Sequence, residues 1–128
     1  MWACRSKYNL PDPATINSRD TAAVVKFLGS FANGPYGTAS GWARVKLKDG
    51  KYTLVLEETD FSNGPDLHVY ISQELSPVTF NDLGKLKSLT GDQTYEIIGS
   101  PDFRLYKYVL IHSQQFNQMY GSSLLQQY

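Results

Sequence analysis

Apolar and polar residues alternate along most of the chain, and a two-residue period is typical of β-strands with one face toward a core. The clearest run is residues 67–72, Leu-His-Val-Tyr-Ile-Ser, in which Leu67, Val69 and Ile71 share one face. The Asn-Gly-Pro of residues 63–65 precedes this run and has the composition of a tight turn. The pattern therefore predicts a turn that leads directly into a strand with its apolar face buried.

The same alternation recurs in several other stretches, most of which are separated by Gly, Pro, Asn or Asp. It predicts strands over residues 24–31, 38–48, 52–58, 85–87, 93–98, 104–112 and 116–120. Asp49-Gly50 is a strong hairpin signal, and residues 73–83 are expected to be a connection. About seven to nine short strands without an amphipathic helix predict an all-β fold, an antiparallel β-sandwich, with a β-barrel as the alternative.

Length and composition fit one globular domain. The chain has 128 residues, 41% hydrophobic and 19% charged. Residues 1–21 lack apolar periodicity and contain two prolines, so they are expected to be a flexible tether before a domain at residues 22–128. Twelve basic and twelve acidic residues cancel, which argues against a nucleic-acid partner or electrostatic attachment to an anionic membrane.

Cys4 is the single cysteine, so the sequence excludes an internal disulfide and a metal site built from cysteines. Ala3-Cys4 followed by a polar segment looks like the processed start of a bacterial lipoprotein. Cys4 is then a candidate lipid anchor, and we expect an extracytoplasmic protein tethered to a bacterial membrane only through that lipid. The alternative is an incidental cysteine in a disordered N-terminus.

Two small sets of residues are candidates for binding a metal ion. His68 and His112 both lie on predicted strands, and if these are neighbours the two imidazoles could bind a metal with Asp60 or Asp66. Asp60, Asn63 and Asp66 also form a loop of oxygen ligands that calcium could use. The alternatives are a solvated His68, a His112 packed at a strand end, and Asx side chains that cap their own turn. Neither set has strong ligand spacing, so no metal or other cofactor is expected.

Nine tyrosines and two tryptophans make the chain rich in aromatic residues. Tyr36, Trp42, Tyr70 and Tyr120 are candidates for an exposed platform that binds a protein partner or a glycan. The alternative is that these rings pack along the edges of the sheets.

The sequence contains no set of residues that suggests catalysis. His112 and Ser113 are adjacent on a predicted strand, so their side chains point to opposite faces and cannot pair as base and nucleophile. No Gly-x-Ser-x-Gly elbow and no phosphate-binding glycine loop are present. We therefore expect a protein that is not an enzyme.

Four stretches of the chain carry a resemblance to a known family. They are YGTASGWARVKLKDGKYTLVLEE, FSNGPDLHVYIS, LGKLKSLTGDQTYEI and YKYVLIHSQQFNQMYGSSLL. In this order they resemble the DM-thirteen domain, a small extracytoplasmic module found beside DOMON domains in animals and alone in bacterial proteins. The resemblance covers residues 25–125, and it implies the same β-sandwich fold.

The resemblance also implies a redox-linked role, because the closing strand of the family usually carries a Trp-Cys pair. The matching residues here are His112 and Ser113, and serine has no thiolate or sulfenate state. The first function hypothesis is therefore a non-catalytic binding or accessory module of the cell envelope. The second is an electron-transfer domain, as the family resemblance implies.

Overall fold

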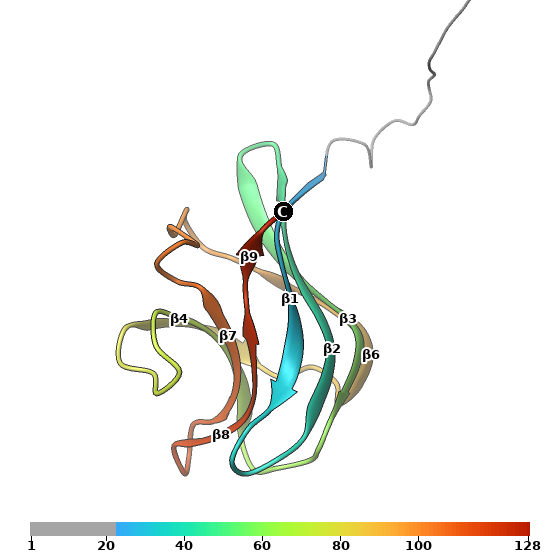
Figure 1. Cartoon of the computed structure of the whole chain (residues 1–128), viewed down its shortest axis with the longest axis vertical. Coiled ribbons are helices and arrows are strands. Elements are labelled where there is room, and N and C mark those ends of the chain that lie inside the picture. The colour runs from blue at the N-terminus through green and yellow to red at the C-terminus, as the bar shows by residue number, and fades with distance from the viewer. Residues whose placement is uncertain (1–22) are drawn as a thin grey trace, which may run out of the picture.

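The computed structural model describes residues 23–128, and the predicted tether with Cys4 lies outside this range (Figure 1). The described residues form nine strands and no helix, so none of them forms a helix able to cross a membrane. The strands are β1 (Val24–Asn33), β2 (Ala39–Lys48), β3 (Lys51–Phe61), β4 (Leu67–Ser72), β5 (Phe80–Lys85), β6 (Thr90–Glu96), β7 (Tyr108–Ser113), β8 (Gln118–Leu124) and β9 (Gln126–Gln127).

All strand pairs are antiparallel, and the strands form one continuous sheet in the order β5-β4-β7-β8-β1-β2-β3-β6, with β9 paired to β1. The two halves of this sheet meet at β1. Most of β1 pairs with β2, whereas its last residues, 31–33, pair with β8. The sheet curls so that the β4, β7 and β8 half lies opposite the β2, β3 and β6 half (Figure 1). The all-β prediction is confirmed, and this half-barrel is compatible with both the sandwich and the barrel.

The core lies inside the curl and is built from the apolar faces that the alternation predicts. Its fully buried side chains include Val45, Leu54, Leu56, Val69, Ile71, Val109 and Ile111. Phe103, from the loop after β6, fills one end of the core, with its ring centroid 5.4 Å from that of Phe27 and 5.0 Å from that of Tyr52. Burial of these side chains, at about 25 cal/mol for each Å² of apolar surface, is the main force that holds the sheet curled.

Small residues allow segments of the chain to approach closely at two places. A Cβ atom on Gly121 of β8 would lie 2.4 Å from the Cβ of Ala39, and one on Gly64 would lie 2.5 Å from the Tyr120 ring. Such distances are shorter than any non-bonded carbon contact, so β8 can close over β2 and the 62–66 turn only with glycine at these positions.

Several predicted elements differ from those observed. The strand expected at residues 116–120 is β8 (Gln118–Leu124), and β5 includes residues 80–83 of the expected connection. The predicted edge strand at residues 85–87 is wrong: β5 ends at Lys85, after Gly84 with φ of +110°, and Leu86 then turns inward and donates its N–H to Leu67 O. The strand predicted from residue 104 begins only at Tyr108, because residues 102–106 form a turn. This strand lies inside the sheet, with β7 between β4 and β8.

The outer face of β4 is also covered, which the alternation did not predict. His68, Tyr70 and Ser72 are only 8%, 2% and 0% exposed. A solvated His68 is therefore excluded. This covered outer face, shared by β5, β4 and β7, carries most of the polar side chains described next.

Candidate functional site

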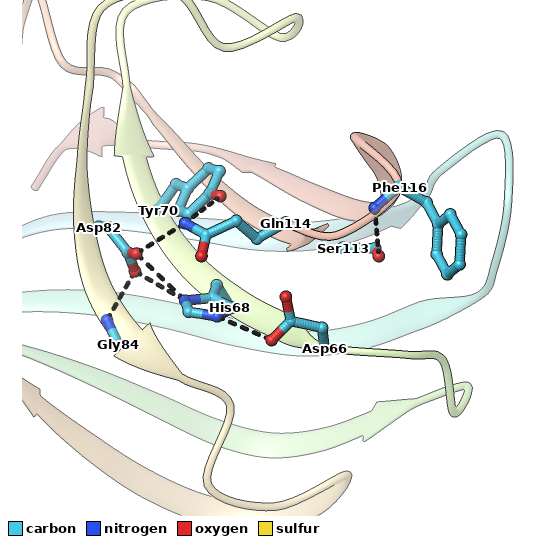
Figure 2. Close-up of polar contacts among 8 residues, drawn as sticks. All are labelled: Asp66, His68, Tyr70, Asp82, Gly84, Ser113, Gln114 and Phe116. Carbon is cyan, nitrogen blue, oxygen red and sulfur yellow. Dashed lines mark hydrogen bonds and ion pairs between the residues drawn. The ribbon is translucent and has the colours of Figure 1, made fainter.

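Five polar side chains meet on the outer face of β4, and we name them the His68 cluster (Figure 2). Asp66 ends the turn before β4, His68 and Tyr70 lie on β4 itself, Asp82 lies on β5, and Gln114 follows β7. The cluster thus joins the edge strand β5 to two segments that are more central in the sheet.

The imidazole of His68 lies between two carboxylates. Its Nδ1 is 3.0 and 3.1 Å from the two Asp82 oxygens, and its Nε2 is 3.1 Å from Asp66 Oδ1. Both ring nitrogens can donate to these oxygens at the same time only when both carry a proton. The His68 side chain is 10% exposed, so its two contacts with carboxylates are shielded from water on the imidazole side.

Asp82 is the acceptor at the centre of the cluster. Besides His68, it accepts hydrogen bonds from the Gly84 N–H at 2.8 Å and from Gln114 Nε2 at 3.1 Å. Burial by itself raises the pKa of the Asp82 carboxyl, but the hydrogen bonds from Gly84, His68 and Gln114 and the charge of His68 outweigh burial. The net result is a pKa below the ordinary value for aspartate.

This lowered pKa predicts acid sensitivity. Asp82 binds protons less readily in the folded chain than in the unfolded chain, so its contribution to stability is present above the unfolded pKa, about 4, and is lost as the pH falls through the folded pKa. We expect Asp82→Asn to reduce the loss of unfolding free energy between pH 6 and pH 3, as measured by urea unfolding. An equal acid loss in the wild type and in Asp82→Asn would contradict this assignment.

Tyr70 lies between two rings. Its ring stacks on Phe80 with centroids 4.3 Å apart and lies 5.3 Å from the ring of His112. Burial raises the pKa of the Tyr70 hydroxyl; the hydrogen bond from Gln114 lowers it, and the charges of Asp82 and Asp66 raise it further. The hydroxyl is therefore held neutral and acts as a structural hydrogen-bond partner for Gln114.

A cleft of about 260 Å³ lies beside His112, between the loop after β1, the loop after β4 and the start of β8. We call it the His112 cleft. Its lining residues are Pro35, Tyr36, Leu75, Ser76, His112, Asn117 and Met119. Tyr36 and Leu75 are 57% and 46% exposed, whereas His112 is 4% exposed. The cleft therefore combines exposed apolar side chains with a buried imidazole.

One nitrogen of His112 has a partner and the other does not. Nε2 lies 2.8 Å from Asn117 Oδ1, an oxygen that can only accept, so Nε2 carries the proton and donates. In the neutral imidazole Nδ1 is then the acceptor, and this atom is buried without a hydrogen-bond partner among the described residues. A buried polar atom without a partner is costly, by about 1 to 3 kcal/mol, and in native proteins it often marks a place where a ligand or water binds.

Ser113, the position of the expected family cysteine, lies on the opposite face from His112. It is 0% exposed and pairs with Leu67 on one side and Gln118 on the other. Its hydroxyl accepts a long hydrogen bond of 3.4 Å from the Phe116 N–H in the next turn (Figure 2). This arrangement caps the turn after β7, and it keeps His112 and Ser113 from acting on a shared substrate.

The candidate metal ligands are only partly brought together. His68 and His112 are directly opposite each other on β4 and β7, but both nitrogens of His68 face carboxylates. Asp60 pairs with β2 and β6, and Asn63 accepts the Gly64 N–H in its own turn. Among residues 23–128, no group of three or more His, Cys, Asp or Glu side chains is arranged to bind a metal ion.

The aromatic candidates are separated by the fold. Tyr36 and Trp42 are 57% and 41% exposed and line two different clefts, whereas Tyr70 and Tyr120 are 2% and 8% exposed. The expectation of one platform of four exposed rings is therefore wrong, because Tyr70 is covered by Phe80 and Gln114 and Tyr120 packs against the 62–66 turn.

Two members of the site were not among the sequence candidates. Asp82 and Gln114 are separated from their partners in the chain, by 14 residues for Asp82 and His68 and by 44 residues for Gln114 and Tyr70. Asp82-Leu83-Gly84 has the local signal of an Asx turn, and the Asp82 carboxylate does accept the Gly84 N–H. That signal indicates a bend at this point, but not the partner across the strands.

Comparison with known proteins places the chain in a family. A family model described as Electron transfer DM13 matches residues 30–125, which include every strand from the middle of β1 to the end of β8. No curated protein and no solved structure gives a significant match. The match covers both His112 and Ser113 and most of the curled sheet. The chain therefore belongs to the Electron transfer DM13 family.

Proposed function

We propose that this protein is a non-catalytic binding or accessory module outside the cytoplasm, with a protein or a glycan as its partner at the cell envelope. The observation that carries the proposal is the His112 cleft, which combines the exposed side chains of Tyr36 and Leu75 with the buried imidazole of His112. Sites for ligands commonly combine an apolar lining with a few placed polar groups.

The residue at the expected cysteine position supports binding over thiol chemistry. Ser113 has no accessible thiolate or sulfenate state, and its side chain is fully buried on the core face. Cys4 is the only thiol in the chain, and it lies outside the family match. The residues of the matched region therefore do not fit a mechanism that passes through a cysteine.

The exposed rim of the cleft provides the test. We expect Tyr36→Ala to weaken partner binding about tenfold or more, because exposed aromatic side chains dominate many binding surfaces. Stability should change by less than about 0.5 kcal/mol, since the ring is more than half exposed. Binding would be measured on a glycan array and by capture from envelope extracts, followed by titration of the purified partner.

Trp42→Ala is the matched control. Trp42 is similarly exposed, but it lines a separate cleft with residues of β1 and β8. Its replacement should leave binding unchanged. If Trp42→Ala abolishes binding and Tyr36→Ala does not, the site has been placed on the wrong face.

Electron transfer is the second candidate function, and the description of the matching family favours it. That description names no carrier group. Voltammetry of the full chain with Cys4→Ser separates the two candidates. A protein that only binds a partner gives no reversible redox couple, whereas a reversible redox couple in the purified protein would support electron transfer.

The proposed location also has a direct test. If Cys4 is a lipid anchor, the cellular protein should partition into detergent and incorporate labelled fatty acid, and Cys4→Ser should abolish both. Labelling that persists in Cys4→Ser would exclude Cys4 as the anchor.

A further inference from the structure

We propose that His112 and Met119 together bind a soft monovalent metal ion, Cu(I), at the floor of the His112 cleft. This goes beyond the proposed function, which uses the same cleft but names no metal ion. Only binding of the ion is proposed.

The two donors are neighbours across two strands. His112 on β7 and Met119 on β8 are direct partners in the antiparallel pairing, and both line the same cleft. Directly opposite residues share a face of the sheet, with Cβ atoms about 4.5 to 5.5 Å apart. An imidazole and a flexible thioether at this separation can reach one ion between them.

The free nitrogen of His112 is prepared for a ligand. In the neutral imidazole, the hydrogen bond from Nε2 to Asn117 Oδ1 leaves the lone pair on Nδ1, which is buried and has no partner among the described residues. Metal-binding histidines usually donate their other N–H to an oxygen in this way. The neighbouring Tyr70 ring, at 5.3 Å and an interplanar angle of 30°, helps to hold the imidazole plane.

The chemistry of the lining selects the ion. Thioether sulfur is a soft donor that favours Cu(I), and imidazole is compatible with copper. The seven lining residues include no carboxylate, so the cleft offers little to Ca²⁺ or Mg²⁺, which prefer several charged oxygens. A singly charged ion also needs less negative charge nearby than a divalent ion does, and no anionic side chain lines the cleft.

Ag(I), a stable substitute for Cu(I), provides the test. The full chain would carry Cys4→Ser, because a free thiolate would otherwise compete, and its methionine methyl groups would carry ¹³C. We expect the Met119 methyl signal to shift and to saturate at one equivalent of Ag(I), while the Met1 signal reports nonspecific thioether binding. Competition with a Cu(I) chelator should then show at least a tenfold loss of affinity in Met119→Leu and in His112→Phe.

Several outcomes overturn the inference. These are equal shifts of both methyl signals, no shift below millimolar Ag(I), or Cu(I) affinity that neither substitution changes. Met119→Leu nearly conserves volume, so this variant remains informative even if His112→Phe does not fold. Ag(I) and Cu(I) binding is measured on the protein without a partner, whereas the Tyr36→Ala test measures partner binding without added metal, so the metal site and the proposed function fail separately.

Discussion

Replacing His68 with leucine is expected to lower the free energy of unfolding by about 2 to 3 kcal/mol. The substitution retains most of the side-chain volume but removes both donors that face Asp66 and Asp82. Each carboxylate side chain is about one-third exposed or less, so water replaces the lost hydrogen bonds only in part. Urea unfolding at pH 7 measures the loss.

Asp66→Asn is the matched control for this prediction. An asparagine still presents an oxygen to His68 Nε2, and it tolerates the positive φ of 53° that Asp66 adopts. Its cost should stay below about 1 kcal/mol. If His68→Leu is as stable as the wild type, the two ion pairs contribute nothing measurable, and the His68 cluster is not what holds β5 in place.

A cysteine at position 113 is expected to be inaccessible to thiol reagents in the folded protein. In a chain with Cys4→Ser, we expect the thiol of Ser113→Cys to react with a disulfide reagent at least about 10³-fold more slowly than in urea. Residue 113 is 0% exposed, so the reaction requires local opening, and an opening free energy of about 4 kcal/mol gives this protection.

A natural control lies in the same turn. Phe116 is 55% exposed, so the thiol of Phe116→Cys should react at nearly the unfolded rate. Rapid reaction at position 113 would show that the turn after β7 opens readily, and a cysteine there would then be available for redox chemistry. Slow reaction would mean that, in this fold, a cysteine at position 113 is inert unless the turn moves.

The strands and their core faces were predictable from the sequence, because side-chain direction along a strand is a local property with a period of two residues. Residues 67–72 were assigned as a strand with its observed bounds, and the predicted apolar face of Leu67, Val69 and Ile71 lies in the core. The Asp49-Gly50 hairpin was equally local, and it joins β2 to β3 as predicted.

The candidate site was only half predictable. His68, His112 and Asp66 stood out because imidazoles and turn carboxylates are recognisable residue types. Asp82 and Gln114 did not, because their importance depends on which strands are neighbours. The burial of Tyr70 was not predictable for the same reason, because its side chain is covered by Phe80 and Gln114, which lie on other segments.

By itself, the sequence determined an all-β domain, its alternating faces and its family resemblance. Only the tertiary structure decided that β1 joins two halves of one curled sheet, that His68 lies between Asp66 and Asp82, and that His112 keeps a free nitrogen beside Met119. The physical reason is that alternation specifies which way a side chain points, whereas strand order and register specify what it meets. Strand order and register depend on how all the apolar faces of the sheet pack together.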